Sequence, residues 1–194
     1  MRAITVEPHA VHSLRLEERP EPAADPASIL VETLCVGVCG TDHEIVAGQY
    51  GWAPAGSARL IIGHESLGRV LEVPDGSPFS AGDFVVGIVR EPDPVPCVAC
   101  RIGEWDMCRN GLYTERGIKS ADGFAAERFR VRPSHAVKVA PELGVLGVLL
   151  EPASILAKAW DHIERIGRRT DSWIPRTALI TGGTAYFVFI SGFL

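Results

Sequence analysis

Apolar residues along the chain fall mainly into short runs of branched and aromatic side chains, which glycine and proline separate. Such runs occupy residues 1–8, 29–38, 67–73, 84–89, 124–132 and 135–139. Runs of this length and composition are typical of β-strands. Many short strands with turn signals between them favour a small, partly open β-barrel.

A helical pattern comes later in the chain. Residues 153–167 place apolar side chains on one stripe with a spacing near 3.6: Ile155, Leu156, Ala159, Trp160, Ile163 and Ile166. Pro152 suits the first helical position, and Gly167 suits the stop. A polar linker follows at 170–176, then a strand at 177–181 that ends in Gly182 and Gly183. A helix, a strand and then glycines is how a dinucleotide-binding βαβ unit begins.

The composition reduces the number of functional classes to consider. The chain has 194 residues, of which 46% are hydrophobic, enough for a sizeable core. Lys and Arg number 19 and Asp and Glu 24, for a net charge of −5 with no basic block, which disfavours nucleic-acid binding. Glycine and proline are abundant, at 20 and 14 residues. The predicted class is therefore mostly β with some α (α+β).

Cysteine use and the two termini bear on location. Three of the five cysteines, Cys97, Cys100 and Cys108, fall within twelve residues, which is metal-ligand rather than disulfide-scaffold spacing. The N-terminus carries no export signal, so a reducing cytoplasm is expected. Residues 177–194 are uncharged, but glycines interrupt them and they are slightly short for a membrane span. We therefore predict a buried strand there and no membrane partner.

Three residues could form a catalytic metal site. Cys39 follows a long apolar run, His64 stands beside another, and Glu151 precedes Pro152. Each has an ordinary structural interpretation, as a buried thiol, a hydrogen-bonded core histidine and a helix-terminal carboxylate. Together they are the ligand types that zinc takes, and three protein ligands leave an open catalytic position. Their spacing alone does not join them.

The motifs around these residues resemble a known family. The run Gly-Val-Cys-Gly-Thr-Asp-His at 37–43 and the run Gly-His-Glu-Ser-Leu-Gly at 63–68 resemble zinc-dependent medium-chain alcohol dehydrogenases. The run Gly-Leu-Tyr-Thr-Glu-Arg-Gly-Ile at 111–118, followed by Asp-Gly-Phe at 122–124, is similar to the glucose dehydrogenase branch. The resemblance covers residues 1 to about 183 and implies a GroES-like barrel followed by a Rossmann NAD(P) domain.

The resemblance also implies roles. Cys39 and His64 match zinc ligands, Glu65 matches an acidic residue that is a ligand or lies just behind one, and Glu151 matches the carboxylate ligand of the sugar and polyol branches. Thr41 matches the hydroxyl that relays the substrate proton. Substrate hydroxyls would contact Thr41, Glu151 and Glu115. The implied cofactors are Zn and NAD or NADP, the implied substrate is a sugar or polyol, and the family is usually homo-oligomeric.

Two departures stand inside this resemblance. The family often has a structural zinc lobe with four cysteines, but here the first position is Pro94, which leaves Cys97, Cys100 and Cys108 as a doubtful metal site. Asp93 is a candidate fourth ligand. The Rossmann fingerprint also fails, because Thr184 and Phe187 stand where its second and third glycines should be.

These observations give three expected segments: a GroES-like zinc-binding catalytic domain at 1–150, a linker helix and the truncated start of a Rossmann domain at 151–183, and an apolar tail unlike the family at 184–194. The favoured function is a zinc-dependent sugar or alcohol dehydrogenase, with this chain alone inactive. The alternative is a non-catalytic zinc-binding remnant. A zinc-free quinone reductase relative fits less well, because the three ligand types are all present. The sequence does not distinguish the sugar, NAD from NADP, or the oligomeric state.

Overall fold

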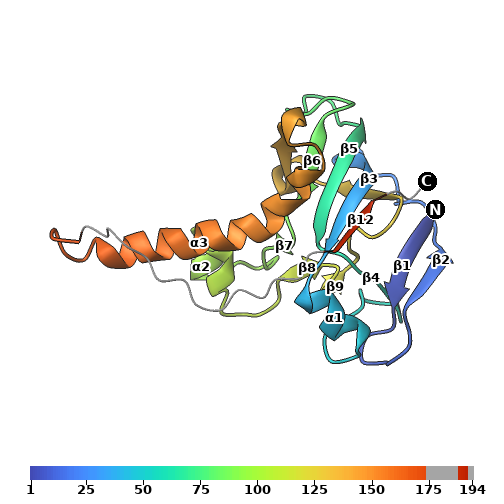
Figure 1. The fold of residues 1–194 in the computed structure, drawn as a ribbon, viewed down its shortest axis with the longest axis horizontal. Coiled ribbons are helices and arrows are strands. Elements are labelled where there is room, and N and C mark those ends of the chain that lie inside the picture. The colour runs from blue at the N-terminus through green and yellow to red at the C-terminus, as the bar shows by residue number, and fades with distance from the viewer. Residues whose placement is uncertain (174–187, 192–194) are drawn as a thin grey trace.

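The computed structural model describes residues 1–173 and 188–191, which form three sheets and a few helices (Figure 1). The largest sheet has the order β10-β3-β5-β6-β11, and β12 also pairs with β3. Its strands are β3 (Ile29–Val38), β5 (Glu65–Glu72), β6 (Phe84–Gly87), β10 (Arg128–Val131), β11 (Ala136–Val139) and β12 (Val188–Ser191). All pairings within this sheet are antiparallel.

The long strand β3 organises this sheet. Alternate residues from Ile29 to Cys35 are buried, as expected for a strand with one face on the core. Its first half pairs with β10, its second half with β12, and nearly its whole length with β5. The end of β3 therefore lies beside the start of β5, which decides where the candidate site forms.

Two smaller sheets complete the β structure. One has the order β2-β1-β4, with β1 (Arg2–Val6), β2 (Arg15–Glu18) and β4 (Leu60–Ile61). The other has the order β7-β8-β9, with β7 (Arg90–Glu91), β8 (Thr114–Arg116) and β9 (Ser120–Ala121). The mostly β class is confirmed. The described strands stay in these three separate sheets and do not close into one barrel.

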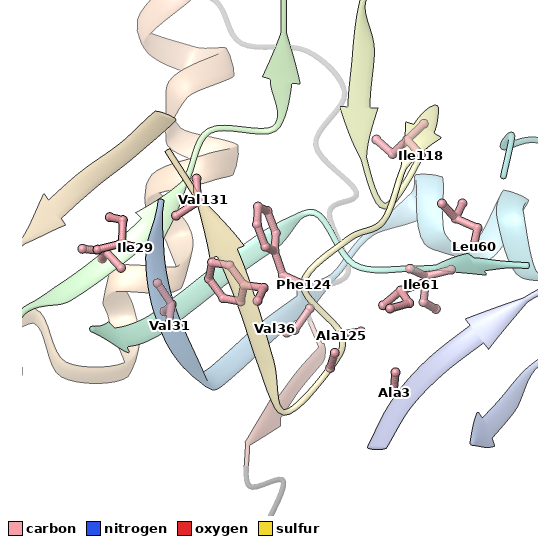
Figure 2. Packing of buried hydrophobic residues seen from close by; sticks show 14 of the residues in the cluster. Ala3, Ile29, Val31, Val36, Leu60, Ile61, Ile118, Phe124, Ala125 and Val131 are labelled. Carbon is pink, nitrogen blue, oxygen red and sulfur yellow. The ribbon is translucent and has the colours of Figure 1, made fainter. Parts of the chain in front are cut away.

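One apolar cluster joins the sheets (Figure 2). Ala3 and Leu60 enter it from the small N-terminal sheet, and Val31 enters from β3. Phe124, which is fully buried, packs against Phe129 with ring centroids 4.6 Å apart. Truncating a buried phenylalanine to alanine typically costs about 3–5 kcal/mol, so this aromatic pair is a principal stabilising contact of the core.

The helices lie at the edges of the sheets. They are α1 (Gly40–Val46), α2 (Val98–Arg101) and α3 (Leu150–Gly167), with the 3-10 segments η1 (Trp105–Met107), η2 (Pro133–His135) and η3 (Pro141–Leu149). Figure 1 shows α3 projecting away from the sheets with α2 alongside it. Lys158 of α3 binds Asp106 at 2.6 Å, and Arg165 pairs with Glu104, so ion pairs hold the segment around α2 and η1 against α3.

The structure corrects three expected boundaries. Pro152 is the third residue of α3 and not the first, so that prediction was wrong. The run 124–132 forms a strand only over β10, because residues 125–127 turn to pair with β1: Ile4 N–H donates to the Ala125 carbonyl at 2.8 Å. In the run 135–139, Pro133 starts a short 3-10 turn through His135, and the strand begins at Ala136.

The structure describes only part of the segments predicted at the C-terminus. In the expected tail, β12 pairs antiparallel with β3, with Val188 opposite Val38. The expected strand at 177–181 lies outside the described residues. The apolar stripe of α3 is exposed, as expected for a face that lacks a packing partner among the described residues; Leu156 is 74% and Trp160 is 51% exposed.

One described stretch, Pro141–Gly167, is long and apolar enough to cross a membrane when it is judged by length and composition alone. It comprises η3 and α3. In α3 the apolar residues form one stripe, and charged residues such as Lys158 and Arg165 bind the segment beside it. An amphipathic pattern of this kind is typical of a helix that packs one face against protein.

Candidate catalytic metal site

The register between β3 and β5 brings Cys39 and His64 together. Gly37 stands opposite Glu65 in this antiparallel pair. Cys39 lies two residues beyond Gly37, just after β3 ends, and His64 lies one residue before β5 begins. Antiparallel strands place the end of one beside the start of the next, so residues 25 positions apart in the chain become neighbours.

Three donor atoms of different types meet at this strand end. Cys39 Sγ lies 3.2 Å from His64 Nε2. The donor atoms of Cys39, His64 and Glu65 all lie within 4.8 Å of one another. His64 and Glu65 are buried, and Cys39 is partly exposed. The arrangement brings together three of the residues that the sequence predicted.

Two glycines make room for this cluster. A Cβ at Gly37 would overlap Glu65 Oε2, so a side chain there would displace the carboxylate. Gly63 has a φ of 84°, a left-handed conformation that favours glycine, and a Cβ there would lie 2.8 Å from Val36 Cγ1. The glycines of both motifs therefore serve the position of the donors.

Asp42 supports His64 from behind, and sequence reasoning missed it. Its Oδ2 accepts a hydrogen bond from Cys39 N–H at 3.0 Å, and its Oδ1 lies 3.5 Å from His64 Nδ1. Asp42 is 2% exposed. A histidine that ligates a metal usually donates its other ring N–H to a carboxylate, which fixes the tautomer and the ring orientation. Asp42 occupies that position.

His64 carries the positive charge in the cluster. Burial opposes the protonated ring, but the Asp42 carboxylate close to Nδ1 and the Cys39 sulfur hydrogen-bonded to Nε2 outweigh it and raise the pKa of His64 to about 11. Burial raises the pKa of the Glu65 carboxyl. Without a metal, a proton on His64 thus compensates the acidic groups around it, and a bound cation would take over that compensation.

Glu151 lies in the first turn of α3, outside the three-residue group. Its carboxylate is not among the donor atoms that lie within 4.8 Å of one another. Burial raises the pKa of the Glu151 carboxyl, and the positive charge of His64 opposes part of that rise. Glu151 therefore interacts electrostatically with the cluster. Its role as a ligand remains a prediction.

The donor set fits zinc. A thiolate, an imidazole and a carboxylate are the ligands that zinc prefers. Glu65 Oε2 and His64 Nδ1 are buried and have no hydrogen-bond partner. Buried polar atoms without partners are costly, and for Glu65 Oε2 a bound cation would remove that cost. For His64 Nδ1, the carboxylate of Asp42 stands nearby and would accept its N–H.

The remaining predicted residues lie on two elements. Thr41 is the second residue of α1, two positions after Cys39, and is half-buried. Glu115 of β8 is held in an ion pair: its Oε1 accepts from Arg90 Nη2 at 2.6 Å and from Arg90 Nε at 3.0 Å. Arg90 also lies over the Tyr113 ring at 4.1 Å. Arg90 had no sequence signal beyond its charge, and it fixes Glu115 in place.

The three-cysteine lobe forms a second cluster. The sulfurs of Cys97, Cys100 and Cys108 all lie within 4.8 Å of one another. A hydrogen bond from Arg109 N–H lowers the pKa of Cys97 to about 6, and burial, followed by the neighbouring thiols, raises that of Cys100 to about 11. Asp93 is buried but is not part of this group; its Oδ1 accepts from Val95 N–H at 2.8 Å.

Two cavities are found among the described residues. One of about 250 Å³ is lined largely by apolar residues and also by Gly37, Asp42 and Gly63, which are close in sequence to the donor residues. Another of about 450 Å³ runs along β10, where Arg128 and Arg130 line it. Cys39, His64 and Glu65 line neither of these two cavities.

The chain is thus a mostly β domain with a thiol, an imidazole and a carboxylate gathered where β3 ends and β5 begins, a donor set of the kind expected for the metal-binding domain of a zinc-dependent dehydrogenase. Comparison with known proteins agrees. The chain belongs to the alcohol dehydrogenase GroES-like domain family, which matches residues 25–141.

Similar proteins in this family include glucose dehydrogenases. The chain is 44% identical over 183 residues to glucose 1-dehydrogenase of Methanocella arvoryzae, a match that covers 94% of this chain and 51% of the relative. It is also 44% identical over 184 residues to glucose 1-dehydrogenase of Thermoproteus tenax, with the same coverage of 94% and 51%. The chain thus spans about half the length of the curated relatives it matches.

A solved glucose dehydrogenase structure is also similar to this chain. The Haloferax mediterranei glucose dehydrogenase in complex with NADP, Zn and gluconolactone superposes with a TM-score of 0.79 and 36% identity. The match covers 88% of this chain and 48% of that one.

Proposed function

We propose that this chain is the zinc-binding catalytic part of a sugar or polyol dehydrogenase of the glucose dehydrogenase type, with NAD or NADP as the hydride acceptor. The observation that carries the proposal is the group of Cys39, His64 and Glu65, of which His64 and Glu65 are buried, with Asp42 behind the imidazole. The glucose dehydrogenase relatives, one of them bound to NADP, Zn and gluconolactone, support the substrate and cofactor classes.

In this proposal Cys39 and His64 hold the zinc, and Glu65 and Glu151 supply carboxylates beside it. When bound, zinc supplies Lewis-acid chemistry that lowers the pKa of a substrate hydroxyl. Asp42 keeps the His64 ring in the orientation that presents Nε2 to the site.

Other residues of the chain handle the substrate. Thr41 lies two residues from Cys39 at the start of α1, and its hydroxyl accepts the proton released from the sugar and passes it on. Carboxylates bind sugar hydroxyls through charge-assisted hydrogen bonds, which assigns Glu151 and Glu115 to substrate binding. Arg90 occupies one oxygen of Glu115 and leaves the other for the sugar.

Under this proposal the chain is divided as follows. Residues 1–150 form the catalytic domain, 151–183 provide the linker helix and the start of the nucleotide-binding part, and 184–194 are a tail outside the family pattern. The described part of the first segment contains all the predicted metal ligands except Glu151.

Two experiments test the proposal. The first measures zinc in the purified chain by metal analysis. It compares the unmodified chain, Cys39→Ser and, as a matched control, Cys35→Ala on β3, the strand that ends just before Cys39. We expect one zinc per chain, lost in Cys39→Ser and kept in Cys35→Ala. Equal zinc in all three would contradict the metal site.

The second experiment tests catalysis. Residues 1–167 replace the matching N-terminal part of the Haloferax mediterranei enzyme, and absorbance of reduced NADP follows the oxidation of glucose. We expect turnover that Cys39→Ser abolishes. A chimera that folds and holds zinc but turns over neither glucose nor simple polyols would favour the alternative, a non-catalytic zinc-binding module.

A further inference from the structure

The three-cysteine lobe contains a pair of thiols that are already close. Cys97 precedes the single helical turn α2, and Cys100 lies within that turn. Their sulfurs are 3.7 Å apart. Cys97 is partly exposed, whereas Cys100 is buried. An accessible thiol with a shielded partner three residues further along is an arrangement that suits thiol-disulfide exchange, because the attacking thiolate must be reachable by the small disulfide.

We propose that Cys97 and Cys100 form a reversible disulfide by exchange with a low-molecular-weight disulfide, which makes the lobe a thiol-disulfide site separate from the catalytic cluster.

The geometry needs little change to form this bond. A disulfide has an S–S length of about 2.05 Å, so the two sulfurs must approach by roughly 1.7 Å. Rotation of the side chains supplies movement of that size. The lobe has anchors that do not involve sulfur: Trp105 stacks on His135 with centroids 5.8 Å apart, and Lys158 binds Asp106. The disulfide can therefore form while the lobe stays in place.

The exchange balances with the named oxidant. The Cys97 thiolate attacks one sulfur of the small disulfide, a mixed disulfide forms, and one small thiol leaves. The Cys100 thiol loses its proton to solvent and its sulfur attacks Cys97, which releases the second small thiol. Two protein thiols are oxidised and one small disulfide is reduced to two thiols.

Metal binding competes with this reaction. Zinc in structural sites takes four ligands, and this cluster supplies three sulfurs, with Pro94 offering no donor and Asp93 lying outside the group. A disulfide between Cys97 and Cys100 removes two of those three donors. A metal and the disulfide are thus mutually exclusive at the lobe, and the missing fourth ligand favours the disulfide.

Peptide mapping tests the proposal directly. The purified chain is equilibrated with glutathione disulfide, quenched by alkylation, and digested with trypsin. Cleavage after Arg90, Arg101 and Arg109 puts Cys97 and Cys100 in one peptide and Cys108 in the next. We expect the 91–101 peptide to be unalkylated and two hydrogens lighter, restored by a dithiol reductant, while the peptide with Cys108 remains alkylated.

Two variants and a measurement in the presence of zinc test the proposal further. Cys108→Ser should still form the disulfide, and Cys100→Ser should trap glutathione on Cys97. One equivalent of zinc per lobe should slow the oxidation without preventing it. The proposal is overturned if Cys97 and Cys100 both stay alkylated, if the 91–101 peptide is cross-linked to Cys108, or if zinc protects both thiols completely.

Discussion

Replacing Asp42 by asparagine should weaken zinc binding while the fold is kept. Asparagine has nearly the same shape, and its Oδ1 can still accept the hydrogen bond from Cys39 N–H that Asp42 accepts at 3.0 Å. What disappears is the negative charge that lies 3.5 Å from His64 Nδ1, and an amide N–H donor takes the place of the acceptor oxygen there. The substitution therefore removes the support that the carboxylate gives the histidine and keeps the contact with Cys39.

The structure sets the size of the effect. A unit charge pair at 3.5 Å interacts with about 5 kcal/mol at an effective dielectric constant of about 20. Both side chains are almost fully buried, so water screens the pair little. Most of this energy cancels, because Asp42 stabilises the protonated ring of the metal-free site as well as the metal-bound ring. The expected net loss in zinc affinity is about 10–100-fold, as is usual for groups behind a ligating histidine.

The assay is competition for zinc with a chromophoric chelator at fixed pH. Glu44→Gln is the matched control, because it removes one negative charge from the same helix at an exposed position. Circular dichroism checks that both variants are folded. An Asp42→Asn affinity within twofold of the Glu44→Gln value would refute the idea that this carboxylate supports the metal site.

Three further predictions concern His64, Gly37 and Arg90. The pKa of about 11 means that His64 is protonated in the metal-free site at neutral pH, so zinc must displace that proton in order to bind. The affinity of the chain for zinc should therefore rise about tenfold for each pH unit between about pH 7 and 9. A zinc affinity that does not change with pH would contradict this. Gly37→Ala should push away the Glu65 carboxylate, lower zinc affinity and cost about 1–3 kcal/mol in urea unfolding; unchanged values of both would disprove the packing argument. In the glucose-oxidising chimera, Arg90→Gln should remove the ion pair that holds Glu115 in place. The KM for glucose should then rise about tenfold, which corresponds to about 1.4 kcal/mol, with a smaller change in kcat. An unchanged KM would show that Glu115 does not hold the sugar.

Local patterns in the sequence were enough to predict most strands and the long helix. Branched side chains marked β3, and the apolar stripe of α3 stood out at helical spacing. The position of Pro152 was wrong for a physical reason. The first four N–H groups of a helix have no partner within it, so proline at the third position of α3 costs no hydrogen bond and does not mark the first residue.

The candidate site was less accessible to local reasoning, because its donors come from separate elements. Cys39 and His64 meet only through the pairing of β3 with β5, and register is a property of two strands together. Asp42 was missed because an acidic residue in the first turn of a helix already has a sufficient local explanation, the favourable interaction with the helix dipole. Its second contact, with His64, is visible only in three dimensions.

Cys39 shows why the choice of substitution matters at this site. It is the residue that caps the start of α1, its backbone is extended, and its N–H is held by Asp42. A substitution that disturbs the start of α1 would therefore also move Asp42 and its contact with His64, and zinc loss would then report misfolding as much as a missing ligand. Serine is among the preferred residues at helix N-caps and keeps the size of the side chain close to that of cysteine. Cys39→Ser thus preserves the helix start and removes only the sulfur donor, so zinc lost in that variant is attributable to the ligand itself.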